Sequence, residues 1–183
     1  MTRESWREWG EPLRALAVAV LVALLIRTFV VETFMVNGVS MKPTLFSGDR
    51  LLVDKLAYRF SKPRIGQIVI LHPPVGTSCT GVGVHPPDYV KRIVAVGGET
   101  VSMRGGQVYV DGQLQPDSYV LSRYRGTTSM APRTVPTGDV WVMGDHRDDS
   151  MDSRCFGPVP VTSLVGQVML VWWPLGLAHI VRP

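Results

Sequence analysis

Cysteine, lysine and runs of like charge are all scarce in this chain of 183 residues. Its 2 cysteines, Cys79 and Cys155, make no disulfide framework and lack C-x-x-C spacing, which argues against a redox motif or a structural zinc site. His72 and His85 flank Cys79, but their spacing matches no familiar ligand pattern, so we expect neither a metal nor a cofactor. The net charge of +4 comes from basic residues scattered along the chain, and we therefore expect no nucleic-acid partner.

One long apolar stretch covers residues 13–26 and is interrupted only by Arg14. As a helix it would span about 21 Å, so its flanks must help it cross the roughly 30 Å of hydrocarbon in a bilayer. A buried soluble helix and a cleaved secretory signal are the alternatives. The stretch has no polar face to show water, and no small-x-small cleavage site follows Ile26, so we favour an uncleaved membrane anchor.

Length and composition divide the chain into an appendage and one main domain. Arginines before the span predict a cytoplasmic segment over 1–12, a transmembrane anchor over 13–31 and an extracellular domain over 32–183. In that domain short β-branched and aromatic runs alternate with Gly and Pro turns, which is typical of an all-β fold. Asp111-Gly112 predicts a type I′ hairpin turn. Residues 73–87 and 115–138 look like long loops. The expected strands are 28–36, 50–58, 67–71, 89–96, 107–110, 140–143 and 165–173.

Two residues could form a nucleophile and its base. Ser40 lies in the turn N-G-V-S-M-K-P-T, where Gly38 allows a tight bend, although a serine in such a turn is most often only a turn residue. Lys91 shares one face of an apolar expected strand with Ile93. Burying that face would favour the neutral amine, which can accept a proton from a serine; the alternative is an edge lysine that discourages aggregation. The other lysines are Lys42, Lys55 and Lys62.

A third constellation, residues 144–157, is dense in Asp, Arg and Ser and follows an expected strand. Such density predicts a network of charge-assisted hydrogen bonds that fixes a loop. A solvated acidic loop and a calcium site are the alternatives, although the D-x-D-x-D-G order of an EF-hand is missing.

Four boxes in this order, behind an N-terminal span, resemble the bacterial type I signal peptidases. They are G-V-S-M-K-P-T, G-D-R-L-L-V-D-K-L-A-Y, Y-V-K-R-I-V-A-V-G-G-E and G-D-H-R-D-D-S-M-D-S-R, and they cover most of the chain. The resemblance implies a mainly β fold, a coiled antiparallel sheet or barrel of the kind also found in LexA. It also implies a membrane-bound serine endopeptidase that removes signal peptides from exported preproteins after small residues, as in Ala-x-Ala, without a cofactor.

The resemblance also assigns roles to residues. Ser40 aligns with the nucleophile, Lys91 with the general base, and Ser150 with a serine that hydrogen-bonds and orients the lysine. Gly38 stands where many Gram-negative members have a serine that donates to the oxyanion, so the oxyanion hole would rest on backbone N–H groups, chiefly that of Ser40. This glycine and the Arg-rich, Lys-poor composition suggest an actinobacterial source. A supporting ionic network is implied for Arg92, Asp145, Asp152 and Arg154.

Departures from the family pattern keep other mechanisms open. His146 and Asp149 replace the usual asparagines, and His146 could instead serve a Ser/His/Asp hydrolase. A self-cleaving repressor of the LexA type is disfavoured, because a membrane span takes the place of its DNA-binding domain. An inactive membrane-anchored β-domain that acts as a binding or assembly partner is disfavoured, because Ser40, Lys91 and Ser150 are all retained. We expect a monomer.

Two further hypotheses concern the domain surface. Cys79 and Cys155 would face an oxidising exterior, so a disulfide between them is a hypothesis. Four aromatic residues either let the domain rest on the bilayer or belong to its core. These aromatic residues are Phe29, Phe34, Trp172 and Trp173.

Overall fold

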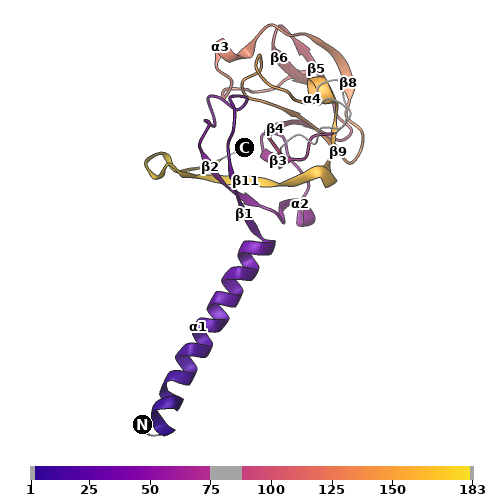
Figure 1. The fold of residues 1–183 in the computed structure, drawn as a ribbon. Coiled ribbons are helices and arrows are strands. Elements are labelled where there is room, and N and C mark those ends of the chain that lie inside the picture. The colour runs from indigo at the N-terminus through magenta and orange to yellow at the C-terminus, as the bar shows by residue number, and fades with distance from the viewer. Residues whose placement is uncertain (1–2, 75–87, 182–183) are drawn as a thin grey trace.

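A long helix carries a β-rich body at its C-terminal end. The computed structural model describes residues 3–74 and 88–181. Figure 1 shows α1 (Arg3–Phe29) as a rod that projects from the rest of the chain. Within it, Glu11–Phe29 has a mean hydropathy of 1.9 and is 0% buried by the described residues. A helix this long and this apolar can cross a bilayer once, which agrees with a single-pass membrane anchor.

Two antiparallel sheets form the β-domain, residues 31–181. The larger sheet has 8 strands in the order β1-β2-β11-β3-β4-β9-β10, with β12 paired to β11, and it curls on itself (Figure 1). Its strands are β1 (Val31–Met35), β2 (Arg50–Asp54), β3 (Ile68–Leu71), β4 (Tyr89–Val96), β9 (Asp139–Met143), β10 (Val159–Pro160), β11 (Leu164–Trp173) and β12 (His179–Ile180).

The smaller sheet has 4 strands in the order β7-β6-β5-β8 and lies at the end of the β-domain far from α1 (Figure 1). Its strands are β5 (Thr100–Arg104), β6 (Gln107–Val110), β7 (Gln113–Leu114) and β8 (Met130–Thr134). Short helices connect the strands: α2 (Ala57–Phe60), α3 (Ser122–Arg125) and α4 (Ser153–Phe156), with 3-10 turns at Val161–Ser163 and Leu175–Leu177.

Both faces of β4 pack against apolar clusters, and this fixes the strand at the centre of the larger sheet. One cluster, which includes Val94 and Trp141, joins the two sheets; another, which includes Ile93 and Val142, covers the opposite face. Because β4 pairs with β3 on one side and β9 on the other, its backbone donors and acceptors are used on both edges. Side chains on β4 are therefore held rigidly.

The mainly β, coiled antiparallel architecture predicted from the sequence is confirmed. The Asp111-Gly112 hairpin turn is confirmed as well, since both residues have positive φ (50° and 78°) and β6 pairs with β7 across them. The expected strand over 28–36 was wrong at its start, because α1 continues its apolar helix to Phe29. The expected strand over 50–58 ends early, since the Asp54 carboxylate accepts the Leu56 N–H and turns the chain into α2.

The loop expected over 115–138 contains β8, an edge strand of the smaller sheet. β8 carries Pro132, which is compatible only with a sheet edge and which hides the strand from pattern reading. Residues 75–87, most of the other expected loop, lie outside the described residues. Cys79 and His85 lie there, so the disulfide remains a prediction.

The four aromatic residues differ in how exposed they are. Phe29 is 63% exposed at the end of α1 and Trp173 is 44% exposed at the end of β11. Phe34 and Trp172 are half-buried, and Arg50 lies over the Trp172 ring, 5.6 Å from its centroid. Only Phe29 and Trp173 therefore remain candidates for contact with a bilayer.

Candidate active site

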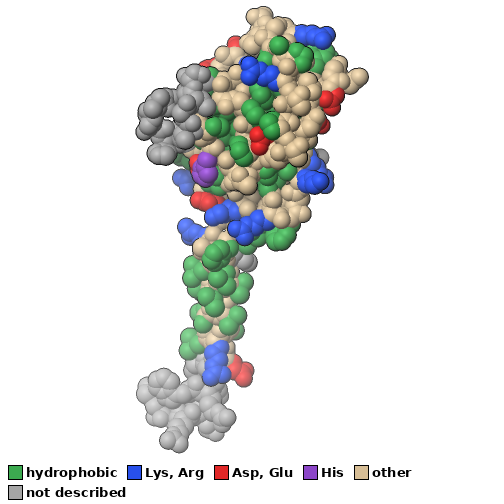
Figure 2. All heavy atoms as spheres, turned by 90° about the vertical axis from the view of Figure 1, so that its right-hand side faces the viewer, with side chains coloured by type: hydrophobic (Ala, Val, Ile, Leu, Met, Phe, Trp, Pro, Cys, Tyr) green, Lys and Arg blue, Asp and Glu red, His purple; other side chains and the backbone are tan. Residues whose placement is uncertain are grey.

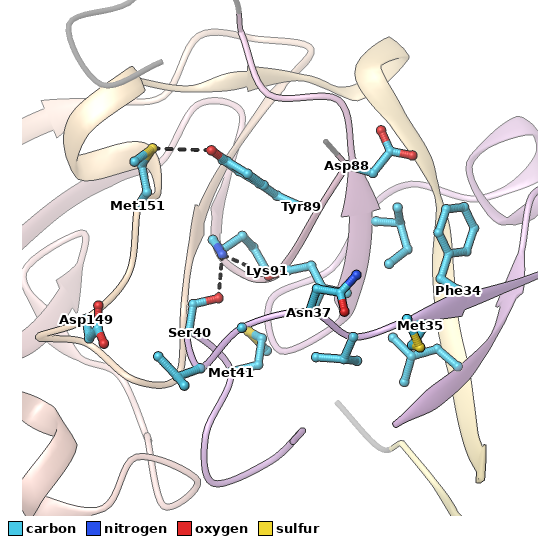
Figure 3. A pocket seen from close by; sticks show the side chains of 16 residues that line it. Phe34, Met35, Asn37, Ser40, Met41, Asp88, Tyr89, Lys91, Asp149 and Met151 are labelled. Carbon is cyan, nitrogen blue, oxygen red and sulfur yellow. Dashed lines mark hydrogen bonds between the residues drawn. The ribbon is translucent and has the colours of Figure 1, made fainter. Parts of the chain in front are cut away.

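The turn that follows β1 brings Ser40 against β4. Gly38 has φ +115°, a conformation that glycine adopts without strain, and the Lys42 N–H donates to the Val39 carbonyl at 3.0 Å to close the turn. Lys91 lies in β4 opposite Val69 of β3. Figure 3 shows the Ser40 and Lys91 side chains pointing toward one another, with Lys91 Nζ 2.7 Å from Ser40 Oγ.

Lys91 is a buried amine on an interior strand. Lys91 is only 4% exposed, and its Nζ also donates to the Val90 carbonyl at 3.1 Å. Burial disfavours the charged form and lowers the pKa of Lys91 to about 8; Asp152 opposes this shift and Arg154 adds to it. The edge-lysine alternative is therefore wrong, because β4 lies between β3 and β9.

The contact between Ser40 and Lys91 suits proton transfer. While the lysine is charged, Nζ donates to the serine oxygen; once it is neutral, the same short distance lets the Ser40 hydroxyl donate to Nζ. A general base must lie within hydrogen-bond reach of the proton it removes, and this pair meets that requirement without a bound substrate.

The backbone N–H of Ser40 is available to a ligand. It makes no hydrogen bond within the part of the chain that the structure describes, although the Ser40 carbonyl accepts the His146 N–H at 3.0 Å. Nothing would lie within 4 Å of a Cβ at Gly38, so the turn is open on that side. A substrate carbonyl oxygen beside Ser40 could therefore accept a hydrogen bond from this N–H, which is the role of an oxyanion hole.

Two ion pairs, one fully buried and one with a half-buried arginine, support the loop that follows β9. Arg92 Nε and Nη2 donate to the two Asp145 oxygens at 2.9 and 2.7 Å, and Thr44 Oγ1 donates to Asp145 at 2.5 Å. Arg154 Nε and Nη2 donate in the same bidentate way to Asp152 at 2.8 and 2.7 Å. The structure thus joins these four predicted residues as two bidentate pairs, a geometry that holds the loop rigidly.

Ser150 lies close to the dyad, but it does not make the predicted bond. Its Oγ is buried and has no hydrogen-bond partner among residues 3–74 and 88–181. A Cβ at Gly144 would collide with both Ser150 Oγ and the Ser40 carbonyl. Gly144 therefore allows the loop after β9 to approach the turn that carries Ser40. The orienting role of Ser150 stays a prediction.

His146 does not reach the nucleophile's hydroxyl in this arrangement. Its Nδ1 lies 3.3 Å from the Val39 carbonyl oxygen and its Nε2 lies 3.2 Å from Asp148 Oδ1. Both ring nitrogens therefore have partners other than Ser40 Oγ, which is engaged by Lys91. This geometry does not support the Ser/His/Asp alternative.

Sequence reasoning missed Thr44, Gly144 and Arg147. Arg147 is 1% exposed, its Nε donates to the Gly144 carbonyl at 3.1 Å, and burial lowers its pKa. All three residues stood inside two of the boxes quoted above, which was a signal that they matter, but their roles depend on contacts that only the folded chain forms.

The dyad opens into a cleft of about 330 Å³. On one side of Ser40 the cleft is lined by apolar residues of β1 and its neighbours, and on the other by the β9 loop (Figure 3). The apolar wall comprises Phe34, Met35, Val36, Leu51, Ile70 and Val90, and the opposite side includes Asp149 and Met151. Apolar residues thus form most of the lining beside the dyad, which suits the binding of an apolar substrate segment.

A serine against a buried lysine in a largely apolar cleft, on a curled β-sheet, indicates the class: this is a serine peptidase. The chain belongs to the family described as "Signal peptidase, peptidase S26", whose model matches residues 6–173.

Curated relatives support this assignment. A probable signal peptidase I-1 from Synechocystis sp. is 37% identical over 92% of this chain and 85% of its own length. A signal peptidase I from Leptolyngbya laminosa is 34% identical over 90% of this chain and 80% of its own. Signal peptidase I T from Bacillus subtilis is 35% identical over 93% and 86%.

A crystal structure of a signal peptidase I from Enterococcus faecalis is also similar to this chain. It matches 58% of this chain and 97% of its own at 27% identity, with a TM-score of 0.47, too low to establish a shared fold by itself. The actinobacterial source stays a prediction.

Proposed function

We propose that this protein removes signal peptides from exported preproteins with Ser40 as nucleophile and Lys91 as general base. The observation that carries the proposal is the 2.7 Å contact between Ser40 Oγ and the buried Lys91 Nζ. The three relatives described above are named signal peptidases, and each matches most of this chain. Their names support the substrate class.

In the proposed mechanism, neutral Lys91 takes the Ser40 proton as Oγ attacks the carbonyl carbon of the scissile bond. The Ser40 N–H then donates to the developing oxyanion. Collapse of the tetrahedral intermediate breaks the C–N bond, and the Lys91 ammonium returns its proton to the departing amine of the mature protein. A water that gives its proton to Lys91 hydrolyses the acyl-enzyme and restores Ser40.

The apolar side of the cleft supports a placement for the signal-peptide side of the substrate. Its apolar side is built from β1, which follows directly from the helix that would anchor the chain, so we place the signal-peptide side of the substrate there. A signal peptide's apolar segment lies in the bilayer, and this side of the cleft begins nearest to it. Cleavage after small residues, as in Ala-x-Ala, is the outcome that the resemblance to the signal peptidases implies.

Several finer features belong to the same proposal. The N-terminal segment over 1–12 would lie in the cytoplasm, the anchor over 13–31 in the membrane, and the catalytic domain over 32–183 outside. Ser150, Gly38 and the two ion pairs of the loop after β9 would support the dyad. The enzyme would act on the bilayer as a monomer, without metal or cofactor.

Cleavage of a preprotein with an Ala-x-Ala site tests the proposal. Detergent-solubilised wild-type protein should release a product whose new N-terminus follows the final Ala, and Ser40→Ala should abolish that product. Ser47→Ala is the matched control, since Ser47 is an exposed serine a few residues further along the chain. Cleavage at another position, or activity that survives Ser40→Ala, would refute the assignment.

A further inference from the structure

A second hollow lies where α1 meets the β-domain, away from the active-site cleft. Its volume is about 620 Å³, and its walls come from the end of α1, from the segment around α2 and from the segment that enters β11. The walls are lined by Thr28, Phe29, Lys55, Leu56, Tyr58, Arg59, Val161, Thr162, Leu164 and Val165. None of these residues lines the cleft that contains Ser40.

The position of this junction pocket places it at the membrane surface. Glu11–Phe29 is the candidate span, and Thr28 and Phe29, its last two residues, form part of the pocket wall. Figure 1 shows α2 beside the point where α1 enters the β-domain. Because the apolar span ends there, the pocket opens at the depth of the lipid headgroups.

The junction pocket has two cationic residues, and only one of them forms an ion pair within the described residues. Lys55 Nζ lies 3.1 Å from Glu32 Oε2 and donates to the Thr28 carbonyl at 3.3 Å, so it is held over the negative end of the α1 dipole. Arg59 is exposed and forms no ion pair within residues 3–74 and 88–181. Figure 2 shows Lys and Arg side chains gathered on the edge of the β-domain directly above the apolar helix.

The rest of the pocket lining is suited to an amphiphile. Leu56, Leu164 and Val165 give it a half-buried apolar wall, while Thr162 adds an exposed hydroxyl to the same lining. A soluble anion would gain nothing from the apolar wall, and a neutral lipid would gain nothing from Arg59. A phosphate joined to acyl chains uses both.

We propose that the junction pocket binds the phosphate of an anionic phospholipid, with Arg59 as its main cationic partner. Such a lipid would tie the β-domain to the bilayer beside α1 and fix the height of the cleft above the membrane. The proposal rests on the membrane anchoring of α1 and does not depend on the identity of the nucleophile or the base.

The test uses the full chain in a mild detergent. Phosphatidylglycerol, phosphatidylcholine with the same acyl chains, and sn-glycerol 3-phosphate are titrated separately, and bound ligand is counted by native mass spectrometry. Wild-type protein should bind phosphatidylglycerol in preference to the other two. Arg59→Gln should weaken that binding about tenfold, the worth of one charge-assisted contact, and raising the salt concentration should weaken it further.

Two variants control the measurement. Arg133→Gln removes an exposed arginine from the smaller sheet and should bind phosphatidylglycerol as the wild type does. Arg59→Lys keeps the charge and should retain most of the binding. Equal binding of the two lipids, unchanged binding by Arg59→Gln, or equal binding of sn-glycerol 3-phosphate would overturn the proposal. Preprotein cleavage by the same Arg59→Gln sample should persist in detergent, which separates a failure here from a failure of the peptidase assignment.

Discussion

Cleavage by this peptidase should depend steeply on pH, because its general base must be neutral to act. Burial lowers the pKa of Lys91 to about 8, from an ordinary lysine value of 10.5. A lysine is neutral above its pKa, so kcat/KM should rise as the pH increases through this value. The neutral fraction is about half at pH 8, about a tenth at pH 7 and about a hundredth at pH 6.

The assay is cleavage of an Ala-x-Ala preprotein under kcat/KM conditions in detergent, at constant ionic strength from pH 6 to pH 10. The logarithm of kcat/KM should rise with a slope near one below pH 8 and level off above about pH 9. His146→Asn should leave this profile in place, because the His146 ring faces Val39 and Asp148 rather than the serine hydroxyl. An inflection that disappears in His146→Asn would instead make histidine the base, and a flat profile would remove the titrating base altogether.

Three further substitutions test the packing of the site, its buried ion pair and the membrane span. Gly144→Ala should lower the free energy of unfolding by about 1–3 kcal/mol, seen in urea melts, and should abolish cleavage, because its Cβ would collide with Ser150 and the nucleophile turn. Arg92→Ala should cost about 3–5 kcal/mol in the same melts, since it leaves the carboxylate of Asp145 buried and unpaired; a loss below 1 kcal/mol would contradict the ion-pair account. Val20→Arg places a charge at the middle of the span, at a cost of about 2.5–3.5 kcal/mol, and should reduce the fraction of protein that resists carbonate extraction, whereas unchanged extraction would argue against a spanning α1.

Local sequence patterns predicted the elements whose structure is set by residues near one another in the sequence. The apolar stretch predicted the helix, the run of β-branched and aromatic residues predicted β4, and Asp111-Gly112 predicted a hairpin turn, since each depends on neighbours in sequence. The edge strand β8 could not be predicted, because Pro132 and its exposed neighbours carry no apolar alternation.

The active site was predictable only in part. The contact between Ser40 and Lys91 joins a turn after β1 to an interior strand, and nothing in their spacing places them together; the resemblance to a family suggested the pair. The burial of Lys91 follows from β4 lying between β3 and β9, and the need for Gly144 follows from the approach of the β9 loop to Ser40. The burial of Lys91 and the need for a glycine at 144 both depend on tertiary structure.

The most direct test of the central claim is a cycle of Ser40→Ala, Lys91→Ala and the double variant, with preprotein cleavage as the readout and Lys62→Ala, an exposed lysine, as the control. If the two residues act as one unit, Lys91→Ala should lower kcat/KM by at least about 10³-fold, and the double variant should be no slower than Ser40→Ala. Lys91→Ala that retains a tenth of wild-type activity, or a double variant in which the two losses multiply, would contradict the dyad.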